Sequence, residues 1–225
     1  MNFPKGLIVS AQALEGNPFR DSEALALMAQ AAEFGGANAI RANGYDDISA
    51  MRKRVTVPII GINKCKDDTG RTVITPNFEG AALVAKAGAN IIALDATFYP
   101  STMKEDTKTL IKRIHEELGL LVMADISTCE EAVAAAELGA DAVSTTLAGY
   151  IPNAMHTAEE LYTPNFKLIS DIVAEKLPVT LVAEGRFWHP SEVKKAYELG
   201  ADAVVIGKAI TNPMAITKYF VAGSK

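Results

Sequence analysis

The sequence predicts an α/β fold, a single (β/α)8 barrel (TIM barrel) that spans residues 1–225. A phrase recurs four times in which a helix-like stretch ends in Gly and an apolar strand follows at once. Four further apolar runs lie between these copies, so eight candidate strands alternate with helical segments. Most of the runs are continuously apolar, as expected when a parallel strand is covered on both faces. These observations favour one lean barrel with no second domain.

The predicted strands follow one another along the whole chain. In order, they lie at Leu7–Ser10, within 31–44, at Val57–Ile62, within 84–97, at Leu120–Ala124, within 135–149, at Val179–Ala183 and within 196–209. Each of the four repeated phrases has a glycine where a helix end requires a left-handed residue, namely Gly36, Gly88, Gly139 and Gly200.

Helices are predicted between the strands. Leu25, Met28, Ala29 and Ala32 follow the spacing of one helix face, and the segment 128–131 has the pattern of a capping box. An open doubly wound sheet is the alternative fold. It is disfavoured because no GxGxxG follows the first strand and the repeat shows no point where the strand order reverses. The longest irregular stretch, 149–164, is expected to be a loop or lid above the barrel.

Composition limits the classes of function. Hydrophobic residues make up 49% of the 225 residues and charged residues 22%, which is typical of a globular protein. No apolar run approaches the roughly 18 residues of a membrane span, and the first residues lack the apolar stretch of a signal peptide, so we expect a cytoplasmic protein. A net charge of −5 argues against a broad nucleic-acid surface and leaves a small anion bound by a local cluster.

Cysteines and histidines give no sign of a metal site. Cys65 and Cys129 are expected to be free thiols, because their spacing fits neither a CxxC motif nor a disulfide framework. His115, His156 and His189 are widely separated and are expected at the surface. We therefore expect no metal.

Polar residues close the predicted strands, where the chemistry of such barrels is located. In chain order they are Gln12, Arg41, Lys64, Asp95, Asp125, Thr145, Thr146, Glu184 and Gly207. Some of them, such as Asp95 and the threonine pair, are equally well explained as caps of the following loops. Lys64, Asp125 and Glu184 stand at corresponding positions of three units, and this arrangement favours a functional site.

The last two units contain a candidate phosphate site. Gly185 and Gly207 allow the backbone to approach a ligand closely, and a short helix beginning near Ala209 would point its N-terminus at an anion. Arg186 and Lys208 follow the two glycines and add positive charge, unless they point outward and are merely solvated. Two glycine–basic pairs in neighbouring units indicate a phosphate-binding corner.

Eight ordered phrases give the chain a family resemblance. It resembles the N-acetylmannosamine-6-phosphate 2-epimerases, which have the ribulose-phosphate-binding type of barrel. The phrases are GLIVSAQAL (Gly6–Leu14), AIRANG (Ala39–Gly44), PIIGINK (Pro58–Lys64), IIALDAT (Ile91–Thr97), MADIST (Met123–Thr128), STTLAGY (Ser144–Tyr150), VAEGR (Val182–Arg186) and GKAITNP (Gly207–Pro213).

The resemblance implies an isomerase that interconverts N-acetylmannosamine 6-phosphate and N-acetylglucosamine 6-phosphate, in sialic acid and amino-sugar catabolism. It implies that Lys64 and Glu184 are catalytic and that Gln12, Arg41 and Asp125 bind and orient the sugar. The C2 proton becomes labile only beside an open-chain aldehyde, so two proton-handling groups suit the reaction and no redox cofactor is required. Lys64 must then be partly neutral, which burial near Arg41 favours.

Some positions depart from the family pattern. Ala11 stands where a Cys is common, and the segment 65–67 replaces the usual Arg-Asp after the lysine. Asn212 stands where the family usually has an Arg that helps to hold the anionic substrate. We hypothesise that Lys208, where the family tends to have a small residue, returns this charge to the same loop.

Three further questions stay open at this stage. The barrel suits another phosphosugar isomerase or an aldolase that uses Lys64 as a Schiff base, and it also suits a non-catalytic phosphosugar-binding paralogue. The sequence does not show which group acts on which face of C2. A homo-oligomer is neither indicated nor excluded, because the outward helix faces show no decisive apolar stripe.

Overall fold

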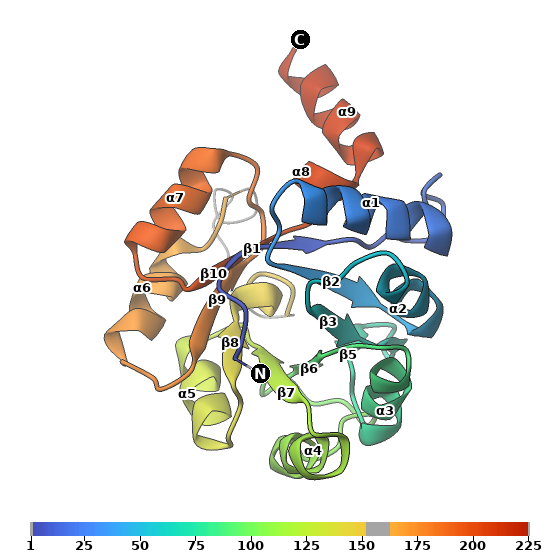
Figure 1. Ribbon diagram of the computed structural model, residues 1–225. Coiled ribbons are helices and arrows are strands. Elements are labelled where there is room, and N and C mark those ends of the chain that lie inside the picture. The colour runs from blue at the N-terminus through green and yellow to red at the C-terminus, as the bar shows by residue number, and fades with distance from the viewer. Residues whose placement is uncertain (1, 152–162, 225) are drawn as a thin grey trace.

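The computed structural model, which describes residues 2–151 and 163–224, is a closed barrel of eight parallel strands (Figure 1). The neighbouring strands run in the order β1-β10-β9-β8-β7-β6-β3-β2. Their bounds are β1 Gly6–Ser10, β2 Ala39–Asn43, β3 Ile59–Ile62, β6 Ile91–Asp95, β7 Leu121–Asp125, β8 Ala142–Ser144, β9 Thr180–Glu184 and β10 Ala203–Ile206. All eight predicted strands are present, and the predicted fold class is confirmed.

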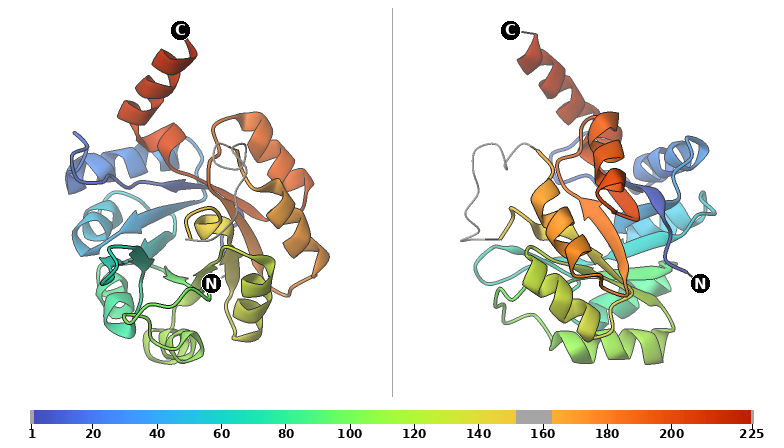
Figure 2. Two further views of the ribbon diagram at one scale, coloured as in Figure 1. Left: turned by 180° about the vertical axis from the view of Figure 1, so that it is seen from behind. Right: turned by 90° about the vertical axis from the view of Figure 1, so that its left-hand side faces the viewer.

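The helices lie outside the barrel, and all but the C-terminal one surround it (Figures 1 and 2). They are α1 Ser22–Phe34, α2 Tyr45–Arg52, α3 Phe78–Lys86, α4 Thr107–Arg113 with the π-helical turn Ile114–Leu118, α5 Cys129–Glu137, α6 Phe166–Ala174, α7 Pro190–Glu198, α8 Lys208–Thr211 and α9 Pro213–Gly223. The predicted capping box is formed, since Thr128 accepts from the Glu131 amide and the Glu131 carboxylate accepts from the Thr128 amide. The glycines at the four repeated helix ends have φ between +96° and +110°, as predicted.

Apolar side chains fill both faces of the barrel wall. Ile8, Ile60 and Met123 are fully buried in the cluster inside the barrel, whereas Ile40 and Ile92 belong to the cluster between the strands and the helices. Each buried side chain of this size contributes roughly 1.5–3 kcal/mol. This two-sided burial is why the strands are continuously apolar in the sequence.

A β-hairpin interrupts the loop between β3 and α3, and the sequence did not predict it. Its strands β4 (Lys64–Lys66) and β5 (Thr72–Ile74) pair antiparallel, with Lys64 opposite Ile74. Two interactions fix the backbone at Lys64. It pairs with Ile74 in the hairpin, and its amide donates to Asn43 Oδ1 at the end of β2 over 2.9 Å. Lys64 therefore occupies a defined place at the carboxyl end of β3.

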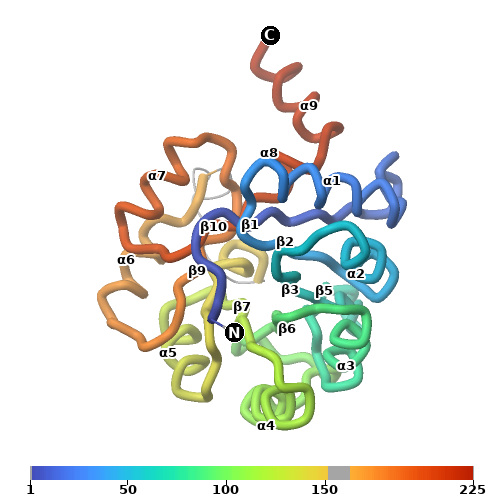
Figure 3. Tube along the Cα trace, in the orientation of Figure 1, coloured from blue at the N-terminus to red at the C-terminus, as the bar shows by residue number. Residues whose placement is uncertain are grey.

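The C-terminal helix α9 projects away from the barrel (Figures 1 and 3). It has no buried residue, and the Phe220 side chain is 69% exposed. Within residues 2–151 and 163–224, no helix has the length and apolar character needed to cross a membrane. Most of the predicted loop or lid at 149–164 lies outside the described residues.

Candidate active site

Three predicted site residues meet at the mouth of the barrel: Asp125 and Glu184 are the last residues of β7 and β9, whereas Arg41 lies two residues before the end of β2 and does not close that strand as predicted. The buried Arg41 guanidinium makes two hydrogen bonds to Asp125, from NH1 to Oδ1 over 3.0 Å and from NH2 to Oδ2 over 2.6 Å. NH1 also donates to Glu184 Oε2 over 2.9 Å. One cation thus serves two carboxylates, and its side chain is only 1% exposed. The Arg41 Nε atom is buried without a hydrogen-bond partner among the described residues.

This arrangement raises the pKa of Glu184. Loss of hydration is the largest cause, and the nearby Asp125 carboxylate adds to it, whereas the Arg41 cation opposes both. Arg41 itself stays charged, because the two carboxylates outweigh the effect of its burial and raise its pKa. Glu184 therefore keeps its proton at a pH where an exposed glutamate has lost it.

Lys64 lies at the same mouth, and its pKa is shifted in the opposite direction from that of Glu184. Its Nζ donates to Gln12 Oε1 over 2.6 Å, and Gln12 Nε2 donates to Ser10 Oγ over 2.8 Å. Loss of hydration and then the Arg41 cation lower the pKa of Lys64, as expected from the sequence. Lys64 keeps a water-exposed surface in the open mouth, so water still screens the amine there. A ligand that fills the mouth removes this water and strengthens the effect.

Lys64 and Glu184 are electrostatically linked through Arg41 and Asp125. The four side chains carry no net charge when Lys64 is protonated and Glu184 is ionised, and none when both are neutral. Either arrangement holds one proton on the pair, so the two groups titrate as a coupled system. A lowered amine pKa beside a raised carboxyl pKa is the pattern of a general base paired with a general acid.

Thr145 and Thr146 belong to this cluster, although the sequence left them as equally probable loop caps. They begin the 3₁₀ turn Thr145–Leu147 after β8. Thr146 Oγ1 lies 2.6 Å from Asp125 Oδ1 and 3.0 Å from Glu184 Oε2. Thr145 Oγ1 accepts from the Glu184 amide and donates to the Glu184 carbonyl, each over 2.9 Å. Their position directly after a buried strand was the sequence signal that could have assigned them.

The predicted phosphate corner lies at the ends of the neighbouring strands β9 and β10. Gly185 has a φ of +115°, and Gly207 is the N-cap of the short helix α8 that the sequence placed there. Lys208 is exposed in the first turn of α8. The Arg186 side chain turns toward two backbone carbonyls. Its Nε donates to the Thr163 carbonyl over 2.7 Å and its NH1 to the Ala148 carbonyl over 2.8 Å. Its guanidinium thus binds the backbone of the β8–α6 connection.

Asn212 acts as a helix cap. Its Oδ1 accepts from the Ala215 amide over 3.0 Å at the start of α9, and from Asn17 Nδ2 over 3.3 Å. Asn17 belongs to the loop that follows β1. The Asn212 side chain is therefore used for capping and for joining two loops.

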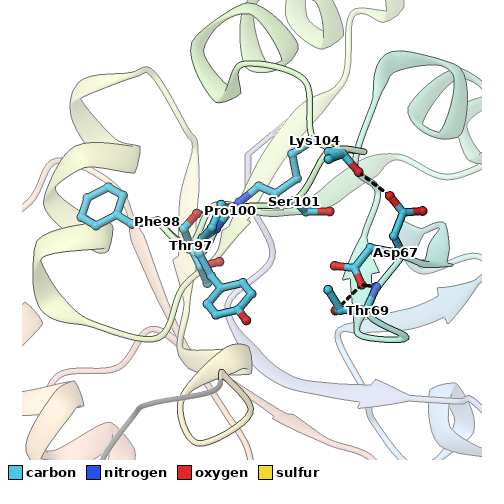
Figure 4. Close-up of a pocket in the computed structure, with 10 residues that line it drawn as sticks. Asp67, Thr69, Thr97, Phe98, Pro100, Ser101 and Lys104 are labelled. Carbon is cyan, nitrogen blue, oxygen red and sulfur yellow. Dashed lines mark hydrogen bonds between the residues drawn. The ribbon is translucent and has the colours of Figure 1, made fainter.

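A pocket of about 540 Å³ lies at the loops that follow β3 and β6 (Figure 4). It separates the hairpin turn, with Asp67 and Thr69, from the loop that begins at Thr97 after β6. Its charged groups have partners: Asp67 accepts from Thr69, and Lys104 donates to Asp95 over 3.1 Å. Asp95 also pairs with Arg71 of the hairpin. Asp95 thus anchors the hairpin and the β6 loop and makes no hydrogen bond to Lys64 or Glu184.

The donor sets at the mouth suit proton transfer better than metal binding. The described residues contain no group of three or more His, Cys, Asp and Glu side chains placed to hold a metal ion. Fold and site together define the class: a (β/α)8-barrel protein that brings an amine of lowered pKa and a carboxyl group of raised pKa together at one mouth of the barrel.

Comparison with known proteins gives the family. Residues 25–225 match the family model described as "Putative N-acetylmannosamine-6-phosphate epimerase", and the chain belongs to this family, as its resemblance predicted. It is 49% identical over 217 residues to a "Putative N-acetylmannosamine-6-phosphate 2-epimerase" of Caldanaerobacter subterraneus subsp. tengcongensis, covering 96% of this chain and 90% of that protein. A relative of the same description from Clostridium perfringens strain SM101 is 44% identical over 215 residues, covering 95% and 94%.

Solved structures agree with this assignment. The structure of the N-acetylmannosamine-6-phosphate 2-epimerase from Clostridium perfringens superposes with a TM-score of 0.90 at 41% identity, covering 96% of this chain and 92% of that one. Thiamine phosphate pyrophosphorylase from Pyrococcus furiosus has a TM-score of 0.61 at 16% identity, covering 95% and 90%, and shares the fold alone.

Proposed function

We propose that the chain interconverts N-acetylmannosamine 6-phosphate and N-acetylglucosamine 6-phosphate by moving a proton at C2. The observation that carries this proposal is the pairing of Lys64, whose pKa is lowered, with Glu184, whose pKa is raised, around Arg41 and Asp125. The family membership supports the substrate. We further propose that residues 1–225 act as one domain and that the reaction serves sialic acid and amino-sugar catabolism in the cytoplasm.

The proposed chemistry needs an open-chain sugar, because C2–H is acidic only beside the C1 aldehyde. Neutral Lys64 takes the C2 proton, and the C–H electron pair forms an enolate with negative charge on O1. The protonated carboxyl of Glu184 then gives its proton to the other face of C2, and the C1 carbonyl forms again. Solvent returns the proton from Lys64 to Glu184. The carbon skeleton undergoes no net redox change, so no redox cofactor takes part.

The neighbouring polar side chains orient the sugar in this proposal. Gln12, bound to Lys64, and the Arg41–Asp125 pair offer donors and acceptors to the sugar hydroxyls and to the enolate oxygen. Hydrogen bonds of this kind stabilise the developing charge without a metal.

The phosphate is assigned to the corner at β9 and β10. Backbone amides at Gly185 and Gly207 approach the anion, and Lys208 adds charge from the first turn of α8. Arg186 supports the site from outside, because it holds the carbonyls of Ala148 and Thr163.

A second candidate is a Schiff-base aldolase, which the lowered pKa of the Lys64 amine favours. Borohydride reduction in the presence of substrate separates the two mechanisms. A Schiff base would leave the sugar covalently attached to Lys64, and the epimerase should release it unmodified.

Proton NMR of N-acetylmannosamine 6-phosphate with the enzyme in D₂O tests the proposal. We expect deuterium at C2 and formation of the gluco epimer. Lys64→Met and Glu184→Gln should each abolish the epimerisation, whereas Lys66→Met, two residues along β4, should leave it intact as a matched control. Absence of both exchange and epimer at millimolar substrate would refute the assignment.

We also propose that the chain forms a homo-oligomer through α9. Tyr219, Phe220 and Val221 are exposed on a helix that packs no residue into the barrel core. A second copy that covers this face would remove apolar surface from water. Light scattering should give a multiple of 23.9 kDa for the chain and a smaller mass for Phe220→Asp. A monomer at all concentrations would contradict the proposal.

A further inference from the structure

The Thr146 hydroxyl lies between the two carboxylates of the active site. Its Oγ1 is 2.6 Å from Asp125 Oδ1, 3.0 Å from Glu184 Oε2 and 2.8 Å from Ser144 Oγ. Arg41 NH1 approaches the same oxygen to 3.3 Å. A hydroxyl has one proton to donate and two lone pairs that accept, so it cannot donate to both carboxylates at the same time.

The two distances favour one placement of this proton. Asp125 Oδ1 is nearer to the hydroxyl oxygen than Glu184 Oε2 is, so it is the preferred acceptor. Glu184 Oε2 then faces a lone pair of Thr146. This contact is favourable only while Glu184 is protonated and donates a hydrogen bond to the Thr146 oxygen. Once Glu184 is ionised, the same contact is favourable only if Thr146 turns its O–H toward Oε2.

Asp125 can lose the hydrogen bond from Thr146 because other groups also donate to it. Its two oxygens each keep a hydrogen bond from Arg41, over 3.0 and 2.6 Å. Glu184 receives one bond from Arg41 NH1, so it depends more on Thr146 when it is charged. The turn of the hydroxyl moves no heavy atom, and Thr145 holds the Glu184 backbone in place from both its amide and its carbonyl.

We propose that Thr146 is a positioning residue whose hydroxyl follows the proton of Glu184, donating to Asp125 while Glu184 is protonated and to Glu184 after it has given its proton to C2. This inference rests on the proposed epimerase reaction. It makes Thr146 specific to the half of the reaction that Glu184 performs, and leaves proton removal by Lys64 unaffected.

Two rates measured in D₂O separate this role from a general structural one. Deuterium incorporation into the starting epimer reports exchange without inversion, and formation of the other epimer reports inversion. With the epimer whose C2 proton faces Lys64, Thr146→Val should lower inversion roughly 10- to 100-fold, the loss of a hydrogen bond to a charged group, while exchange continues. With the other epimer, exchange and inversion should fall together, because Glu184 must remove that proton.

Matched variants complete the test. Thr146→Ser keeps the hydroxyl and should restore inversion to within about threefold of wild type. Thr102→Val, which removes a hydroxyl from the flanking pocket, should behave as wild type. Thr146→Ala replaces Thr146→Val if the latter does not fold, as judged by circular dichroism.

Three outcomes decide the question. Wild-type inversion by Thr146→Val, or an equal loss of exchange and inversion with both epimers, would overturn the role of Thr146. A Thr146→Ser enzyme as impaired as Thr146→Val would do the same. If wild type itself shows neither exchange nor inversion, the proposed function fails instead.

Discussion

Replacing Arg41 with Met removes the cation that the Asp125 and Glu184 carboxylates share. Arg41 and Asp125 are 1% and 0% exposed, so water cannot take the place of the lost guanidinium. Breaking a buried ion pair by removing one partner costs about 3–5 kcal/mol. In a chain of 225 residues this corresponds to a melting temperature lower by roughly 6–20 °C.

Urea and thermal unfolding measure this effect, and a surface pair of the same type provides the control. Arg54 pairs with Glu23 over 2.8 Å, but the two side chains are 35% and 60% exposed. Arg54→Met should therefore cost less than about 1 kcal/mol. Adding Asp125→Asn to Arg41→Met should recover part of the loss, because one uncompensated carboxylate is removed. If Arg41→Met is no more destabilising than Arg54→Met, the buried network is not holding the barrel mouth together.

Three further outcomes follow from the site and the fold. With the epimer whose C2 proton faces Lys64, activity requires neutral Lys64 and protonated Glu184, so kcat/KM should rise with pH through a midpoint below 10.5 and fall through one above 4.5; a pH profile with no falling limb would contradict the acid role of Glu184. Lys208→Ala should raise KM for the phosphosugar about fivefold with kcat unchanged, whereas Lys194→Ala on α7 should not, and equal KM values would exclude Lys208 as a phosphate ligand. Thr128→Ala removes the capping box and should lower the unfolding free energy by about 1 kcal/mol without changing kcat/KM, as calorimetry and a standard assay can check.

Much of the active site could be predicted because a parallel barrel brings the ends of all its strands to one mouth. Asp125 and Glu184 close two strands and Arg41 lies within a third, far apart in the sequence, and their guanidinium and carboxyl groups meet within 3.0 Å. Arg186 differs, since its place after a strand does not determine the direction of its side chain, and here it binds backbone carbonyls.

The sequence by itself determined the strands, the helix ends and the order in which polar residues close the strands. These features depend on local properties: apolar runs covered on both faces, glycines with positive φ and the capping box of Thr128. Only the tertiary structure decided that the hairpin fixes Lys64, that α9 leaves the barrel, and that Thr146 lies between two carboxylates. Those arrangements depend on contacts between residues far apart in the chain, and a hydroxyl's choice between two acceptors depends on distances that a sequence does not contain.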